Sequence, residues 1–183
     1  MNLYQNKYRI PTARATWHDY SGGAYFITIC TAGRMHYFGE IENGEMQLSA
    51  IGKIASDHFS NVSIHYPYAE IPLFVVMPNH IHAIVIIDGN DGNYRNAINR
   101  VSTATETTTV ISRNPMIYKS LGTVIRGVKA RISRMAHLNG IPFGWQARFY
   151  DHIIRNQDEM NRIATYIYHN VSQWDLDELN KAE

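Results

Sequence analysis

The sequence predicts a mixed α+β domain on the ferredoxin-like or RRM-like βαββαβ pattern, an antiparallel sheet with packed helices, plus a C-terminal helix that bears a tyrosine. Three observations predict this fold. Short apolar, β-branched runs are typical of strands, other apolar residues recur at helical spacing, and the two kinds of segment alternate along the chain. The length of 183 residues suits a single domain spanning 1–183.

The first half of the chain is expected to hold three strands, a hairpin and a helix. The run AYFITICT at 24–31 is rich in β-branched and aromatic residues, as strands are. Asn43-Gly44, between two strand-like segments, is a strong hairpin signal. Behind Ser49, a suitable helix cap, apolar residues recur at helical spacing. Two further β-rich runs, 71–77 and 81–87, are separated by Pro78-Asn79 and should pair antiparallel.

The second half begins with a segment of a different kind. Residues from about 89 to 114 have no sustained apolar period, which predicts a flexible insertion. Helical spacing returns at 121–135 and should end at Asn139-Gly140. Residues 149–154 are a strand candidate. Asn156, with Glu159 three residues later, then forms a capping-box pattern that opens a helix through about residue 170.

The composition indicates where in the cell the protein is expected. No run approaches the roughly 20 apolar residues that span a bilayer, and the N-terminus lacks the apolar run of a secretory signal, so no membrane partner is expected. The single cysteine, Cys30, cannot form an internal disulfide, which favours the reducing cytoplasm.

The net charge of +1 conceals one strongly basic segment. Between Arg113 and Tyr150 there are seven basic residues and no acidic one. Such a segment favours a local anion-binding surface, for which nucleic acid is a candidate partner. A basic helix face that is merely solvated would give the same pattern, and charge alone does not decide between the two.

Two histidines stand two residues apart in the run FVVMPNHIHAIVII. Because side chains alternate along a strand, His80 and His82 should lie on one face, where two imidazoles can share a metal ion. A histidine pair of this spacing also occurs without metal, so the motif is weak on its own.

The last helix carries a second candidate group. Its apolar stripe, which should pack on the sheet, comprises Met160, Ile163, Ile167, Val171 and Trp174. Tyr166 and Asn170 are one turn apart at the edge of this stripe and can look into one pocket, whereas Tyr168 points away. A tyrosine at the rim of a core is the alternative interpretation of Tyr166.

Several segments together resemble the HUH superfamily of single-tyrosine nucleases, and within it the REP-associated tyrosine transposases. They are YSGGAYFITICTAGRMHYFGEI at 20–41, VVMPNHIHAIVII at 75–87, WQARFYDHIIRN at 145–156 and YIYHNV at 166–171, in the order that the family has them. One departure is Val171, where the family usually has proline, and this puts the end of the helix in question.

The resemblance implies a specific chemistry. His80, His82 and Asn170 would hold a divalent metal ion, Mg²⁺ or Mn²⁺, and Tyr166 would be the nucleophile. The implied function is cutting and rejoining of single-stranded or hairpin DNA through a covalent 5′-phosphotyrosine, which requires no nucleotide cofactor; no P-loop pattern is present. Family members act as monomers or homodimers, and both are left open for this chain.

The resemblance and the charge pattern also point to DNA contacts. The basic candidates for phosphate contacts are Arg126, Lys129, Arg134 and Arg148. Trp145 and Tyr150 are candidate stacking platforms for unpaired bases. His152 is a candidate supporting group near the metal, or else a structural histidine.

Three other functions are compatible with parts of the sequence. A metal-dependent hydrolase could use the histidine pair and a bound water, with Tyr166 only packed. An RNA-recognition-like binding module could share the βαββαβ order, but its aromatic signature is missing from ITICT and VVMPN. A degenerate transposase could bind DNA without cutting it, although the full ligand set argues against this.

Overall fold

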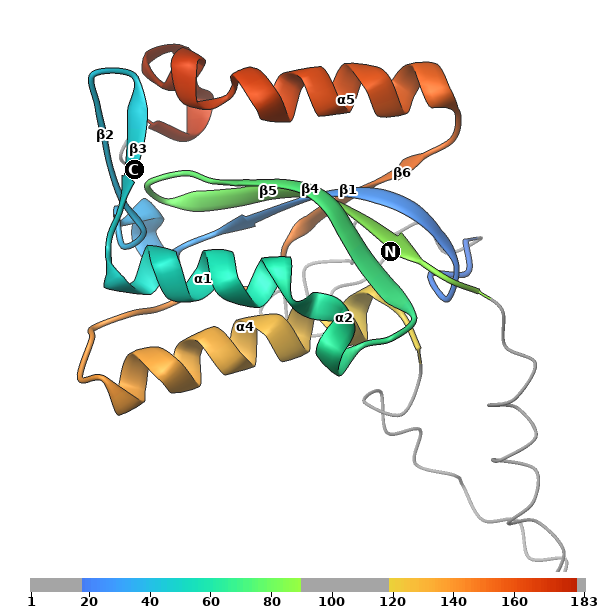
Figure 1. Ribbon diagram of the computed structural model, residues 1–183, viewed down its shortest axis with the longest axis horizontal. Coiled ribbons are helices and arrows are strands. Elements are labelled where there is room, and N and C mark those ends of the chain that lie inside the picture. The colour runs from blue at the N-terminus through green and yellow to red at the C-terminus, as the bar shows by residue number, and fades with distance from the viewer. Residues whose placement is uncertain (1–17, 90–118, 181–183) are drawn as a thin grey trace, which may run out of the picture.

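The computed structural model describes residues 18–89 and 119–180 of the chain. Its centre is a four-stranded antiparallel sheet with the strand order β4-β5-β1-β6 (Figure 1). The strands are β1 (Gly23–Cys30), β4 (Ala69–Val76), β5 (His80–Ile87) and β6 (Tyr150–Ile154). This order and direction confirm the predicted ferredoxin-like sheet.

The helices cover both faces of this sheet. They are α1 (Ala50–Ser60), the short α2 (Val62–His65), α4 (Leu121–Leu138) and α5 (Gln157–His169). Figure 1 shows α1 and α4 on one face and α5 alone on the other. Each of the three long helices begins at a polar cap, and the Asn156 side chain accepts a hydrogen bond from the Glu159 amide at 2.9 Å. The predicted start of the last helix is thereby confirmed.

The predicted hairpin forms a small sheet of its own, β2 (Gly39–Glu42) and β3 (Glu45–Leu48). Asn43 and Gly44 both have positive φ, 52° and 79°, as a tight hairpin turn requires. Gly39 has φ 137°, and a Cβ there would lie 2.0 Å from the Gln47 carbonyl oxygen, so only glycine fits.

Alternation along the strands divides the buried side chains between the two faces. Tyr25, Ile27 and Ile29 of β1 join the larger core under α1 and α4. On the opposite face a smaller core is centred on Ile84, Ile154 and Ile167, under α5. The even-numbered residues of β5, which include both histidines, therefore face α5.

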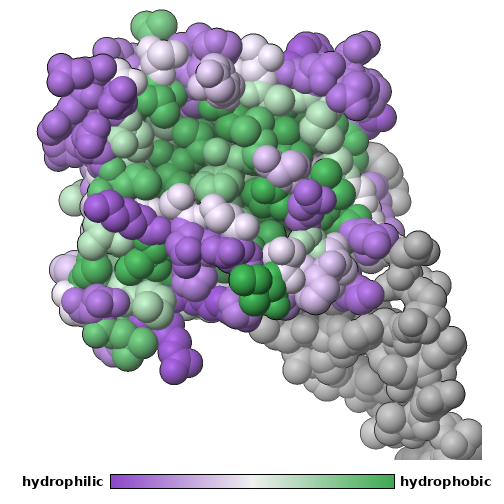
Figure 2. Space-filling model, in the orientation of Figure 1, coloured by the Kyte–Doolittle hydropathy of each residue, from purple (hydrophilic) through white to green (hydrophobic). Residues whose placement is uncertain are grey.

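The edge strand β4 contributes to both cores because its side chains alternate between the two faces, and its register shifts between Glu70 and Leu73, around Pro72. Beyond the shift, Phe74 packs on the larger core and Leu73 and Val75 on the smaller one. These side chains are half-buried. Figure 2, in the orientation of Figure 1, shows apolar surface in the middle of the molecule, with more polar surface above and below it.

The chain ends on the α5 side of the sheet in two 3-10 turns, η3 (Val171–Leu176) and η4 (Glu178–Asn180). Helix α5 ends at His169 and the backbone tightens into η3 directly after Asn170, so Val171, which stands in place of the expected proline, does not extend the helix. None of the described helices combines the length and the apolar character that a bilayer span needs. The insertion predicted at about 89–114 lies, apart from Gly89, outside the described residues.

Candidate active site

The two histidines of β5 lie side by side and buried on the face that α5 covers, as predicted. Their ring centroids are 4.5 Å apart, and the residues are 0% and 3% exposed. Each ring is oriented through Nδ1. Nδ1 of His80 lies 2.8 Å from Asn79 Oδ1, and Nδ1 of His82 lies 2.9 Å from Thr28 Oγ1. Both Nε2 atoms are therefore left for other partners.

The hydrogen atom of the His80 ring can be assigned from its neighbours. The Asn79 amide nitrogen donates to the Leu179 carbonyl at 2.8 Å, so the Asn79 oxygen is the atom that faces His80. An amide oxygen can only accept, so Nδ1 of His80 carries the hydrogen and Nε2 offers a lone pair. This is the tautomer that binds a metal through Nε2.

Helix α5 brings a phenol and an amide to the same place. The Tyr166 hydroxyl oxygen lies 3.1 Å from Nε2 of His82, while the residue stays 42% exposed and thus open to a substrate. One turn later, Asn170 is only 2% exposed. Tyr168 is 79% exposed and packs against His169, away from the histidine pair, as its helical position predicts.

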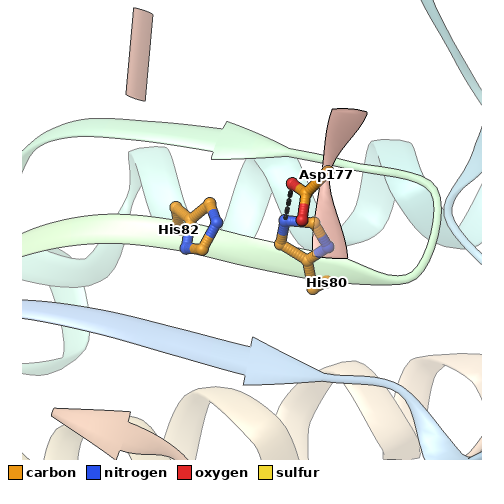
Figure 3. A group of neighbouring side chains, drawn as sticks. All are labelled: His80, His82 and Asp177. Carbon is orange, nitrogen blue, oxygen red and sulfur yellow. Dashed lines mark ion pairs between the residues drawn. The ribbon is translucent and has the colours of Figure 1, made fainter. Parts of the chain in front are cut away.

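Asp177 also belongs to this cluster, although no sequence pattern singled it out. Its Oδ2 lies 3.8 Å from Nε2 of His80 and 3.5 Å from the Asn170 amide nitrogen, which donates to it. The ligand atoms of His80, His82 and Asp177 all lie within 4.8 Å of one another. Figure 3 shows the carboxylate reaching the His80 ring, with His82 next to it along the same strand.

Burial sets the charges of these groups. Desolvation, joined by the nearby His82, lowers the pKa of His80 well below its usual value. Desolvation also lowers the pKa of His82 to about 4, against a smaller opposing effect of Asp177. The pKa of Tyr166 is raised by burial and by the Asp177 charge. At neutral pH both imidazoles are neutral and the phenol is protonated.

The residues of the cluster fit a divalent cation. Two buried polar atoms have no hydrogen-bond partner among the described residues, namely Nε2 of His80 and Oδ1 of Asn170. Buried acceptors are rarely left unpaired, because each then forfeits its hydration without return. Imidazole nitrogen, amide oxygen and carboxylate oxygen, without a thiolate, form a donor set that suits Mg²⁺ or Mn²⁺.

Known proteins resemble the chain along most of its length. An uncharacterized protein of Haemophilus influenzae is 32% identical over 161 residues, which cover 87% of this chain and 86% of that protein. A putative REP-associated tyrosine transposase of the same organism is 26% identical over 149 residues, 81% of this chain and 70% of that protein. The chain is thus similar to a REP-associated tyrosine transposase over most of its length. No protein-family model matches it.

The fold of the chain agrees with that of a solved transposase structure. That structure, of a REP-associated tyrosine transposase bound to a REP hairpin, has a TM-score of 0.59 and 20% identity. The match covers 91% of this chain and 77% of the other. At this level of identity the likeness concerns the fold.

Four of the predicted DNA contacts do not adjoin Tyr166. Arg126 and Arg134 are exposed on α4, which packs on the opposite face of the sheet from α5. Lys129 donates to the carbonyl oxygens of residues 146 and 148, each at 2.9 Å. Trp145 is half-buried against Phe143 and donates its ring N–H to the Lys129 carbonyl at 3.1 Å. Through these hydrogen bonds Lys129 and Trp145 hold parts of the fold together, and DNA binding by either residue stays a prediction.

The other three predicted residues are near the α5 side. Arg148 is exposed, with φ 71°, in the loop before β6. Tyr150 is 56% exposed at the first position of β6. His152 makes a 2.8 Å contact through Nε2 with Glu159 of α5, so it ties the strand to the helix rather than to the histidine pair.

Asp177 could be found in the sequence only as one of several acids after residue 174. Its place depends on η3 folding back over β5 and on the Leu179 amide, which donates to Asp177 Oδ1 at 2.8 Å. No periodicity rule predicts such a turn.

Proposed function

We propose that the chain is a metal-dependent single-stranded DNA endonuclease and strand transferase that works through a covalent 5′-phosphotyrosine. The observation that carries this proposal is the 3.1 Å contact between the Tyr166 hydroxyl and Nε2 of His82. A nucleophile and a metal ligand that meet in one chain form a site that needs no residue from a second copy. The similarity to REP-associated tyrosine transposases supports the same chemistry.

Each residue of the cluster has a role in this proposal. His80, His82 and Asn170 hold the cation, with Asp177 as a further oxygen ligand. A Mg²⁺ or Mn²⁺ ion bound there supplies polarisation of the scissile phosphate and stabilises charge on its oxygens. Tyr166, exposed at the edge of the cluster, is the group that meets the phosphorus.

The bond changes balance without a nucleotide cofactor. The Tyr166 oxygen bonds to phosphorus, the bond from phosphorus to the 3′ oxygen breaks, and the departing 3′ oxygen ends as a hydroxyl with one proton. The phenol loses its own proton. Because the phosphodiester is replaced by a phosphotyrosine ester, a DNA 3′-hydroxyl can attack that ester and rejoin strands.

The proposed substrate is hairpin-containing DNA with an unpaired strand at the cleavage position. A related protein of the same fold is bound to a REP hairpin in its solved structure. An open cleft of about 410 Å³, lined by Tyr166, Asn170 and Asp177 among others, adjoins the nucleophile and can admit a strand.

A pair of tyrosine variants tests the proposal. Hairpin oligonucleotides from the flanks of the gene are incubated with Mn²⁺, and adducts are scored as bands that resist SDS and are lost to protease. Tyr166→Phe should abolish the adduct, while Tyr168→Phe, on the exposed side of the same helix, should keep it. His80→Ala, His82→Ala and EDTA should each prevent its formation.

A second enzyme class gives a different result in the same assay. A hydrolase that activates water at the histidine pair would cut DNA without any adduct, and Tyr166→Phe would still cut. Cleavage of that kind would replace the transferase by a hydrolase.

A further inference from the structure

A second cleft, beside Tyr166, lies between β6 and α5. It has a volume of about 330 Å³ and is lined by Phe26, Tyr150, His152, Glu159, Arg162, Ile163 and Tyr166. It lies where α5, which packs mainly over β4 and β5, borders β6. A ligand in the cleft would touch the nucleophile itself.

Aromatic rings line the floor of this cleft. Tyr150 is 56% exposed, although it belongs to a strand. Its ring meets that of Phe26 edge-on at 6.4 Å, and Phe26 in turn meets Tyr166 edge-on at 6.1 Å and stacks on His82 at 5.2 Å. The ring of Tyr150 is thus fixed at one side while its remaining surface faces solvent. A fixed, exposed ring is the platform on which an unpaired base stacks.

A positively charged side chain, that of Arg162, lines the other wall of the cleft. Arg162 lies one turn before Tyr166 on α5, about 6 Å away along the helix axis. Arg162, Tyr166 and Asn170 are spaced four residues apart, so they follow one side of the helix. Arg162 is exposed, and no hydrogen bond or ion pair of its side chain occurs in the described part of the chain. The guanidinium is therefore available for a phosphate within one nucleotide of the scissile one.

The acidic residue of the cleft does not neutralise this arginine. Both oxygens of Glu159 accept other hydrogen bonds, from the His152 ring at 2.8 Å and from the Arg155 amide at 2.8 Å. The same pair fixes the His152 imidazole at the end of the cleft, where its second ring nitrogen can meet the polar edge of a base. Ring surface, cation and polar end together match one nucleotide.

We propose that this cleft is a subsite for a single unpaired nucleotide adjacent to the scissile phosphate, with Tyr150 stacking on the base and Arg162 binding the phosphate. This inference rests on the function proposed above and names the part of the substrate that the site reads. A duplex cannot fill the subsite, since its bases are already stacked and paired. The subsite therefore selects DNA in which the residue next to the cleavage position is unpaired.

The first test measures binding without cleavage. In the Tyr166→Phe background, the Kd for a single-stranded oligonucleotide that spans the cleavage position is measured by fluorescence anisotropy. Tyr150→Ala should weaken binding by roughly 5- to 100-fold, the usual effect of removing one stacking ring, and Tyr150→Phe should restore it. Arg162→Gln should lower the slope of log affinity against log salt by about 0.7, whereas Arg155→Gln, an exposed arginine outside the cleft, should not.

The second test locates the base. Oligonucleotides are made with an abasic residue on either side of the cleavage position, and adduct formation is followed with wild-type protein and with Tyr150→Ala. At one of the two positions, the abasic residue and Tyr150→Ala should each slow the reaction and their combination should be no slower than either alone. Tyr168→Ala, exposed on α5, serves as the control with unchanged rate.

The outcomes separate the two proposals. The subsite is wrong if the wild type forms an adduct but, at both positions, the rate reductions caused by the abasic residue and by Tyr150→Ala multiply. The base then does not stack on Tyr150. If the wild type forms no adduct while Tyr150 and Arg162 still govern binding, the proposed chemistry is wrong and the nucleotide subsite stands.

Discussion

The hydroxyl oxygen of Tyr166 lies 3.1 Å from Nε2 of His82, the ring nitrogen through which that histidine would bind a cation. In the tautomer that can accept a cation, Nδ1 carries the hydrogen and donates to Thr28 Oγ1, 2.9 Å away. A cation bound at this nitrogen would compete with the phenol for one lone pair. Binding of the metal and release of the proposed nucleophile would thus be linked at a single atom.

This competition predicts how the nucleophile affects metal affinity. Tyr166→Phe should bind Mn²⁺ as tightly as the wild type or a few-fold more tightly, because no phenol has to leave His82. Titration calorimetry or the electron paramagnetic resonance of free Mn²⁺ measures this, with His82→Ala as the variant that loses binding. Weaker Mn²⁺ binding by Tyr166→Phe would mean that the phenol is itself a ligand.

The partner of the His82 ring should also matter to the metal. Thr28→Val keeps the shape of the side chain and removes the Oγ1 that holds Nδ1, so Mn²⁺ affinity should fall by about 10- to 100-fold. Thr28→Ser retains the hydroxyl and should keep most of the affinity. Equal affinities for the two variants would show that the threonine does not orient the ring.

The buried histidines predict a pH dependence of stability for the protein in EDTA. The folded pKa of His82 is about 4, below the ordinary 6.5, and that of His80 is lowered too. Between these two pH values the unfolded chain takes up protons that the folded chain refuses, so the free energy of unfolding decreases as the pH falls. For His82 alone the loss reaches at most about 3 kcal/mol, and no such loss occurs above the unfolded pKa.

Urea unfolding at a series of pH values measures this effect. The wild type should lose stability across the window from about 6.5 to about 4, and His82→Asn should show a shallower slope. If both proteins gave the same slope, the His82 imidazole would take up its proton as readily in the folded state as in the unfolded one.

Lys129 provides a test of structure against DNA binding. Its ammonium group donates to two carbonyl oxygens of the 146–148 loop, so Lys129→Met should reduce the free energy of unfolding by about 1–3 kcal/mol. The salt dependence of DNA binding should change little. A stable Lys129→Met protein with a salt slope lowered by about 0.7 would instead establish Lys129 as a phosphate contact.

Local rules predicted the parts of the site that depend on one element. The alternation of side chains along a strand put His80 and His82 on one face, and helical spacing separated Tyr166 from the exposed Tyr168. The Asn156 cap likewise follows from a local pattern, an asparagine with Glu159 three residues later.

The remaining parts depend on how distant segments pack, which local rules do not reach. Asp177 enters the cluster only because η3 folds back over β5. The engagement of Lys129 with loop carbonyls, and the separation of Arg126 on α4 from the α5 face, depend on the same kind of long-range packing. A basic stretch of sequence does not reveal which face of the sheet it will cover.

The most direct measurement is the identity of the residue that carries the DNA. After reaction with a hairpin oligonucleotide and Mn²⁺, nuclease trimming and trypsin digestion, the peptide IATYIYHNVSQWDLDELNK, residues 163–181, is sequenced by tandem mass spectrometry. The nucleotide should be found on Tyr166. A nucleotide on Tyr168 or on any other residue, or DNA cleavage with every peptide unmodified, would contradict the role of Tyr166 as nucleophile beside the histidine pair.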